Sequence, residues 1–252
     1  MNLIGFLSSF QRVHLWATLL GFAGVFVCAI LPHTHFHVND DVMMLMISSG
    51  WFGESYRALN LFMSHWIGLW FDMVYGLAPQ WPWYALTQYA LQAIAWAVVA
   101  GVLFRTQGMT RGLVIWLIAF ALLGSYLAVS LTYTTTAGLV AAAGCLLLTD
   151  AIKNVNKRTL LFAGALLSMA ACVRFESMAL VGLLWCPILL WRLFRSRNLD
   201  RWLWTGAAVL AAFSLHVGQW VWKQQLPALE EFYANRYIKA FNDYNQRQYP
   251  YT

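Results

Sequence analysis

Long apolar stretches separated by small clusters of basic residues constrain the fold of this chain more than any other feature. Hydrophobic residues make up 61% of its 252 residues and charged residues only 10%, with a mean hydropathy of +0.59. Soluble domains carry about 25% charged residues, so this composition is typical of a protein embedded in a membrane. The pattern predicts an all-α, polytopic helical membrane protein.

Seven apolar stretches are expected to cross the membrane. They are residues 13–32, 83–104, 115–131, 137–148, 160–173, 177–191 and 202–222. Basic residues follow alternate stretches, at Arg105 and Arg111, at Lys153, Lys157 and Arg158, and at Arg192, Arg195, Arg197 and Arg201. With the N-terminus in the cytoplasm, all of these clusters are cytoplasmic, as the positive-inside rule requires. The prediction is therefore a seven-span module over residues 1–222, followed by an outer polar segment, residues 223–252.

Residues 56–77 are also apolar enough to span, but they contain Arg57, His65 and Asp72. A crossing here would reverse every later stretch and move the basic clusters to the outside. We therefore expect this segment to lie flat on the outer membrane surface, within a long first outer loop at residues 33–82. The side chains expected to enter lipid are Trp66, Trp70 and Phe71.

Two of the predicted spans, residues 137–148 and 160–173, are shorter than the roughly 20 residues that a full crossing needs. Short spans require the bilayer to thin locally or a cavity to cut into the outer leaflet. We expect such a cavity at the outer face.

Adjacent carboxylates, Asp40 and Asp41, follow the first span within HTHFHVNDDVMMLMISSG, residues 33–50. Together with Asn39 they suit the N-terminus of a short helix that ends at the Ser-Ser-Gly sequence. They can also act chemically, because a desolvated carboxylate beside a second one has a raised pKa. Such a group can remove a proton from an acceptor hydroxyl, or can bind a metal ion that holds a phosphate. The sequence leaves the structural and the catalytic interpretation open.

Three alternating histidines, His33, His35 and His37, precede the acidic pair and would share one side of an extended segment. A metal site of imidazoles and carboxylate is one interpretation, but solvated loop histidines explain the pattern better. We predict no metal ligands among them and no cofactor, with a divalent metal at the acidic pair left open. The net charge of +6 is dispersed between apolar stretches, so we expect no nucleic-acid partner.

Arg174 and Glu176 interrupt a run that is otherwise apolar from residue 160 to residue 191. They could form an outer turn in which Arg174 reaches the lipid headgroups. We favour a substrate-binding role for both, because ionisable groups at this depth usually face a cavity and arginine can hold a phosphate through two hydrogen bonds.

The threonine-rich run TYTTT, residues 132–136, lies at the outer end of the third predicted span. Its hydroxyls can satisfy backbone groups at a helix terminus, or they can line the same pocket as Arg174. The first interpretation is the one we favour.

The order of these features resembles the GT-C superfamily of integral-membrane glycosyltransferases: a first span, an outer Asn-Asp-Asp, a long outer loop and paired spans. The segments NDDVMMLMISSGWFG, PWY, TTTAGLVAAAG and CVRFES look like those of uncharacterised bacterial polytopic proteins of that type. The resemblance implies a GT-C-like transmembrane module with juxtamembrane helices in its first outer loop. Superfamily members are usually longer, so either this chain keeps only the core module or further spans lie outside the sequence.

The resemblance also implies an enzyme that moves a sugar from a polyprenyl-phosphate donor to a glycan or lipid-linked acceptor at the outer face. The catalytic role of an acidic residue in the first outer loop falls on Asp40 or Asp41, and contact with the phosphate on Arg174. The implied location is the bacterial cytoplasmic (inner) membrane, with membrane lipid around the protein and a cytoplasmic N-terminus. The alternative is a transporter or flippase for a lipid-linked or anionic solute, gated by Arg174 and Glu176.

Overall fold

The computed structural model describes residues 3–31, 34–37, 39–51, 63–154, 157–196 and 199–224. These residues are almost entirely helical. The long helices are α1 (Leu3–Ala29), α4 (Trp83–Gln107), α7 (Tyr133–Asn154), α8 (Lys157–Ser196) and α9 (Leu199–Gln224). The shorter elements are α2 (Asn39–Ser48), α3 (His65–Leu77), α5 (Met109–Ala119), the π-helical turn η2 (Phe120–Gly124) and α6 (Ser125–Val129), with two strands, β1 (His35–Phe36) and β2 (Ser130–Leu131). The all-α prediction is confirmed.

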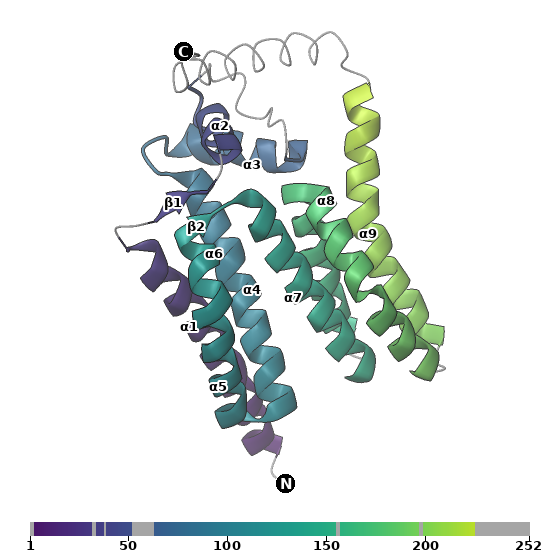
Figure 1. The fold of residues 1–252 in the computed structure, drawn as a ribbon. Coiled ribbons are helices and arrows are strands. Elements are labelled where there is room, and N and C mark those ends of the chain that lie inside the picture. The colour runs from purple at the N-terminus through teal and green to yellow at the C-terminus, as the bar shows by residue number, and fades with distance from the viewer. Residues whose placement is uncertain are drawn as a thin grey trace, which may run out of the picture.

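Five helical segments in the described part of the chain are long and apolar enough to cross a membrane. They are Arg12–Ala29, Trp83–Gln107, Met109–Val129, Tyr133–Ile152 and Lys157–Arg195, and Thr205–Gly218 is a shorter apolar helix. The long helices run side by side in Figure 1. Large apolar side chains such as Phe26, Leu122 and Leu183 are exposed on the outside of the described helices. These features indicate a membrane protein, whereas the sides of the membrane stay predictions.

Helix α8 is interrupted at Arg174, whose backbone is extended with φ −160° and ψ 110°. The break falls between the predicted spans 160–173 and 177–191, and the second half of α8 turns away from the first beside the end that carries α2 and α3 (Figure 1). If both halves and α9 cross the membrane, the helical passes number seven. The structure thus provides a turn at the place where the sequence predicts one.

The prediction of a short span at residues 137–148 is wrong, because α7 covers Tyr133–Asn154. Hydroxyl-bearing residues on both sides of the predicted span, among them Thr135 and Thr149, are part of the helix. Thr135 Oγ1 donates to the Thr132 carbonyl and Thr149 Oγ1 donates to the Cys145 carbonyl, so both hydroxyls are satisfied by the helix backbone. Helix α1 begins at Leu3, but its membrane-length apolar part, Arg12–Ala29, starts next to the predicted residue 13.

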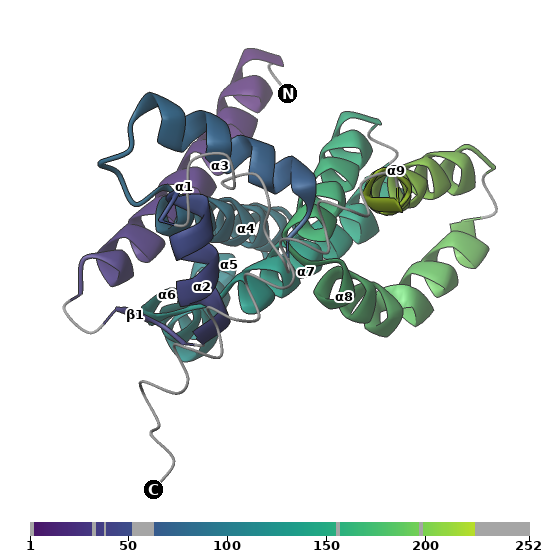
Figure 2. The same cartoon turned by 90° about the horizontal axis from the view of Figure 1, so that it is seen from above.

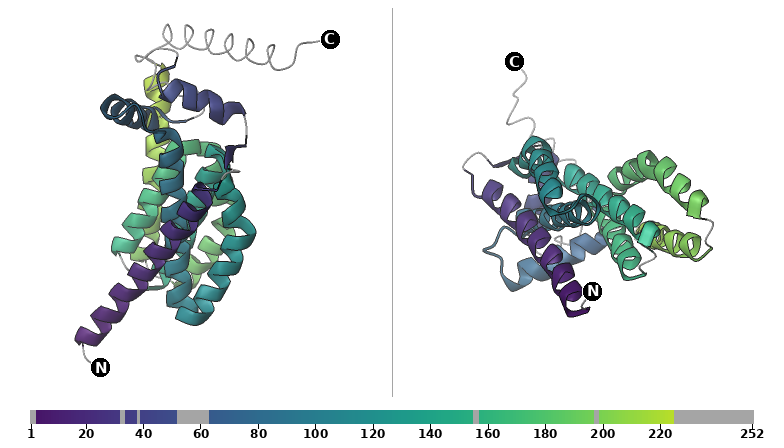
Figure 3. Two further views of the ribbon diagram at one scale, coloured as in Figure 1. Left: turned by 90° about the vertical axis from the view of Figure 1, so that its left-hand side faces the viewer. Right: turned by 90° about the horizontal axis from the view of Figure 1, so that it is seen from below.

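Helices α2 and α3 lie across one end of the long helices, as Figures 2 and 3 show from above and from the side. Ile67, Phe71, Val74 and Tyr75 of α3 are buried at the spacing of one helical face. Helix α3 therefore has the orientation expected of a helix lying on a membrane surface, although residues 52–62 are outside the described part.

The prediction that Phe71 enters lipid is wrong. This side chain is 1% exposed and packs against Tyr75 and Tyr84, with ring centroids 6.4 and 5.6 Å away. Trp66 and Trp70 are 53% and 41% exposed, as expected of the apolar face of a surface helix. Phe71 differs because it lies on the face of α3 that covers the helix bundle.

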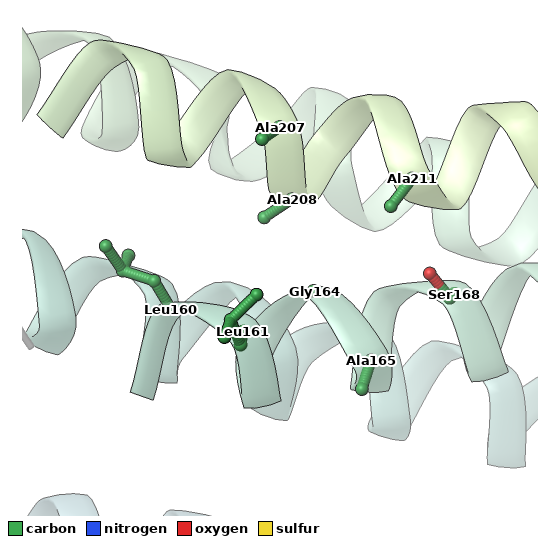
Figure 4. A pocket seen from close by; sticks show the side chains of 8 residues that line it. All are labelled: Leu160, Leu161, Gly164, Ala165, Ser168, Ala207, Ala208 and Ala211. Atoms are coloured by element: carbon green, nitrogen blue, oxygen red, sulfur yellow. The ribbon is translucent and has the colours of Figure 1, made fainter. Parts of the chain in front are cut away.

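Small residues allow close contact between neighbouring helices. A Cβ atom on Gly21 of α1 would lie 2.5 Å from the Ala97 nitrogen of α4, so no larger residue fits there. Figure 4 shows a shallow groove between α8 and α9, lined by Gly164, Ala165, Ser168, Ala207, Ala208, Ala211 and two leucines. The lining of this groove is typical of helix packing in membranes rather than of a chemical site.

Cysteines placed at Gln80 and Gln107 test the predicted orientation. Both residues are exposed, with Gln80 between α3 and α4 and Gln107 at the far end of α4. In a Cys186→Ser background, we expect an impermeant maleimide added to intact cells to label Gln80→Cys and to spare Gln107→Cys, because the basic clusters lie at the Gln107 end. Labelling of the Gln107→Cys variant from outside would reverse the orientation.

Candidate functional site

The Asp41 carboxylate is the centre of a polar site where α2, α4 and α7 meet. Asp41 is 0% exposed, and its Oδ1 atom accepts hydrogen bonds from the Tyr84 hydroxyl at 2.8 Å and the Tyr133 backbone N–H at 2.9 Å. The donors belong to α4 and α7, and their positions are 43 and 92 residues further along the chain. One buried oxygen therefore links three elements that are distant in sequence.

The short strands place α2 beside the start of α7. His35 and Phe36 pair in parallel with Ser130 and Leu131, and the His37 N–H donates to the Leu131 carbonyl at 3.1 Å. This pairing fixes the chain just before α2 next to the chain just before Tyr133. Asp41, in the first turn of α2, then faces the first turn of α7.

Helix α3 supports the site from the other side. The Tyr75 hydroxyl accepts a hydrogen bond from the Tyr84 N–H at 3.1 Å, and the Ser64 N–H donates to the Cys172 carbonyl at 2.8 Å. The first bond holds the start of α4, and the second holds the segment of α8 just before Arg174. Both ends of α3 are thus fixed to helices that contribute side chains to the site.

Burial raises the pKa of the Asp41 carboxyl above its ordinary value, because desolvation penalises the charged form. The hydrogen bonds from the Tyr133 N–H and the Tyr84 hydroxyl act in the opposite direction, and Thr132 and Gln88 add to them. Thr132 and Gln88 do not form a well-oriented hydrogen bond with the second carboxyl oxygen of Asp41, Oδ2. This atom has no hydrogen-bond partner among the described residues. Oδ2 is therefore the atom on which a proton would be held.

Neutral polar side chains continue from Asp41 into the interior. The Thr136 hydroxyl donates to Gln88 Oε1 at 3.2 Å, and Gln92 Nε2 donates to Thr136 Oγ1 at 3.0 Å and to the Leu127 carbonyl at 3.2 Å. Gln88, Gln92 and Thr136 are all buried. These bonds join α4 to α7 below the carboxylate.

Arg174 reaches the same site from the break in α8. Its Nη1 atom donates to the Tyr133 hydroxyl at 3.3 Å and to Thr134 Oγ1, and its guanidinium carbon lies 5.2 Å from the centre of the Tyr133 ring. Glu176 Oε2 lies 3.7 Å from Arg174 Nε, with side-chain exposures of 74% and 33%. Arg174 is thus held by α7 while part of its guanidinium remains accessible.

The predicted site residues converge on Tyr133. Asp40, Asp41 and Arg174 are each close enough to interact electrostatically with its hydroxyl. Asp40 is half-buried, whereas Asp41 is completely buried, so the adjacent carboxylates occupy different environments. Glu176 touches the site only through Arg174 and is largely solvent-exposed.

Sequence reasoning missed Tyr84, Tyr133, Gln88 and Gln92. A signal for the glutamines was present, because two amides four residues apart lie on one face of an otherwise apolar helix. The favoured interpretation of residues 132–136 as helix-end hydroxyls was also incomplete. Thr132 approaches Asp41, Thr134 accepts from Arg174 and Thr136 bonds the glutamines, so the run forms one wall of the site.

The described residues contain no group of three or more His, Cys, Asp and Glu side chains that could hold a metal ion. His35 and His37 are exposed, and the His37 ring lies 6.3 Å from that of Tyr126. His33 is outside the described residues.

Comparisons with protein-family models, with curated proteins and with solved structures found no match. The site is therefore interpreted from its own geometry. It combines a half-buried carboxylate, a buried carboxyl and an arginine around one phenol. Such a set can accept a proton on one side and stabilise an anion on the other.

Replacing Asp41 by Ala and by Asn separates hydrogen bonding from charge. Asp41→Ala removes the acceptor for the Tyr84 hydroxyl and the Tyr133 N–H, and each buried unsatisfied donor costs about 1–3 kcal/mol. Asp41→Asn keeps an acceptor oxygen and removes the buried charge. We expect the thermal unfolding midpoint in detergent to fall for Asp41→Ala and to be retained for Asp41→Asn, and equal losses would contradict the assignment.

The pH dependence of stability follows from the raised pKa of Asp41. Because the folded state binds the proton more tightly than the unfolded state, this group's contribution decreases as pH rises from the ordinary aspartate pKa through the raised one. The unfolding midpoint of the parent protein should therefore fall more steeply with pH over this window than that of Asp41→Asn. Parallel curves for the two proteins would show that Asp41 keeps an ordinary pKa.

Proposed function

We propose that this protein is a membrane glycosyltransferase that moves a sugar from a polyprenyl-phosphate donor to a hydroxyl of a glycan or lipid-linked acceptor. The observation that carries the proposal is the convergence of Asp40 and Arg174 on Tyr133 at one end of the bundle. Such a reaction needs a base and an anion-binding group in the same site. The resemblance of the acidic-pair and CVRFES segments to GT-C proteins points to the same chemistry.

Asp40 is the candidate base because it combines partial burial with partial exposure. The acceptor hydroxyl would give its proton to the Asp40 carboxylate while its oxygen bonds to the anomeric carbon of the sugar. The bond from that carbon to the phosphate oxygen breaks, and its electron pair leaves with the lipid phosphate. Asp41 positions this centre, since its carboxyl is occupied by Tyr84 and Tyr133.

Arg174 is the candidate phosphate anchor. The leaving phosphate gains negative charge as the glycosidic bond breaks, and a guanidinium can donate two hydrogen bonds to it. The bonds to Tyr133 and Thr134 use Nη1, and Glu176 faces Nε at 3.7 Å. When the sugar donor binds, its phosphate would replace the exposed Glu176 carboxylate beside Arg174 Nε.

The distribution of charge favours a transferase over a transporter. In α4, α5 and α7, the charged residues Arg105, Arg111, Asp150 and Lys153 lie close to one end of the helices. The buried polar groups further along these helices, such as Gln88 and Gln92, are neutral. A carrier for an anionic solute is expected to place charge near the middle of the membrane.

The proposed location is the bacterial inner membrane, with the N-terminus cytoplasmic and the site outside.

Complementation of surface-glycan synthesis tests the proposal, with each variant compared at equal membrane abundance. Asp40→Asn removes the proton acceptor and keeps the shape, so we expect a loss of about 100-fold to 10,000-fold in the rate of glycan formation. Asp72→Asn is the matched control, because Asp72 is an exposed carboxylate on α3. Normal glycan formation by the Asp40→Asn variant would exclude Asp40 as the general base.

Arg174→Lys should also reduce glycan formation, because lysine keeps the charge and loses the planar fork. The reduction should be smaller than that of Arg174→Gln, which loses the charge as well. Arg111→Lys, an exposed arginine at the opposite end, is the control. An equal rate for Arg174→Gln and the parent protein would exclude Arg174 as the phosphate anchor.

A further inference from the structure

A second polar site lies at the end of the bundle opposite Asp41. Helices α1, α4, α7 and α8 enclose a groove with a cavity volume of about 490 Å³, which we call the distal groove. Its polar end contains Arg105, Arg158 and the imidazole of His14, and its apolar part contains Phe22, Ile94 and Phe162. Arg105 and Tyr84 are 21 residues apart on α4, so the polar end of the groove and the Asp41 site are separated by about 31 Å.

The direction of each helix sorts polar from apolar residues along the groove. Helix α1 runs from His14 toward Phe22, α8 runs from Arg158 toward Phe162, and α4 runs from Ile94 toward Arg105. The two arginines and His14 therefore gather at one end. The distance from Arg105 to Ile94 is eleven helical residues, about 16 Å. The hydrocarbon core of a membrane is ~30 Å thick, so this length is close to the thickness of one leaflet.

The groove opens onto the apolar outer surface of the bundle. Phe22 and Phe162 are 46% and 48% exposed, and both flank the groove. The floor of the groove is lined by small residues, among them Ala17, Ala97 and Gly101. A Cβ atom at Gly101 would make ordinary contacts, 3.5 Å from Arg105 Nη1 and 3.7 Å from the Ala17 Cβ atom. The small lining residues and the groove volume of about 490 Å³ leave room for an extended chain.

Arg105 is oriented by an ion pair. Its Nε and Nη2 atoms donate to Asp150 Oδ2 at 3.2 and 2.9 Å, and Asp150 is 8% exposed. Its Nη1 atom makes no hydrogen bond to another described residue and lies over the groove floor at Gly101. Asp150 thus holds the guanidinium in place, while no carboxylate is among the groove-lining residues. The polar end is electrostatically suited to an anion.

We propose that the distal groove binds an anionic phospholipid of the leaflet at that end. The phosphate would lie between Arg105, Arg158 and His14, and one acyl chain would follow the groove past Val98 toward Ile94. Basic pockets between transmembrane helices are known to bind anionic lipid headgroups. The arginines at the polar end suit a phosphate group. The length of the groove matches the thickness of one leaflet, which favours a lipid over a soluble anion.

Native mass spectrometry of the detergent-solubilised protein tests this binding. We expect the parent protein to retain added phosphatidylglycerol in preference to phosphatidylcholine. Arg158→Gln should weaken phosphatidylglycerol binding about fivefold, since one charge near a headgroup contributes on the order of 1 kcal/mol. Arg111→Gln removes a charge at the same end outside the groove and should leave the affinity unchanged.

Two further measurements make the result specific to the groove. The double substitution Arg105→Gln and Asp150→Asn removes the guanidinium without leaving the Asp150 carboxylate buried and unpaired. It should also weaken phosphatidylglycerol binding. Ala97→Leu should weaken retention of phosphatidylglycerol by occupying the chain path while the charges remain. Equal retention of the two lipids, equal weakening by Arg111→Gln, or full displacement by millimolar inorganic phosphate would each overturn the proposal.

Discussion

The buried carboxyl of Asp41 is the interaction on which the arrangement of this protein depends most. A charge placed in a site without water is costly unless hydrogen bonds compensate for it. Here the compensating donors come from α4 and α7, so the carboxyl cannot be satisfied unless both helices are in place. The same requirement brings α2 down onto the bundle and leaves Asp40, one residue earlier, at the boundary with solvent. A stabilising contact and a reactive position thus arise from one pair of residues.

Most of the helical architecture could be predicted from the sequence, because it depends on local patterns. The short helix after Asn39 and the break at Arg174 were both predicted from residue types at their positions. The span at residues 137–148 was predicted too short because the helix continues through the flanking threonines, whose hydroxyls bond to its own carbonyls. Phe71 was misplaced because a surface helix buries one face, and hydropathy alone does not say which one.

The composition of the site was only half predictable. The charged members, Asp40, Asp41 and Arg174, stand out in an apolar chain, and their meeting at one end follows from the alternating direction of the helices. Tyr84 and Tyr133 do not stand out, because aromatic residues are 16% of the sequence and most of them face lipid or core. Their role depends on hydrogen bonds across 43 and 92 residues of chain, which no local pattern encodes.

Helix α4 is fastened to its neighbours along its whole length. Tyr84 is bound to Asp41 at one end, Gln88 and Gln92 are bound to Thr136 in between, and Arg105 is paired with Asp150 of α7 at the other end. Sliding of α4 along α7 would break polar bonds at every level at once, so these two helices form a rigid unit. Helices α8 and α9 meet instead through alanine and glycine, without such a series of polar bonds at their shared groove. Helix α8 is itself bound to α7 through Arg174 and Trp185. A movement that admits a large substrate beside Arg174 would therefore displace α9 from α8 while α4, α7 and α8 stay together.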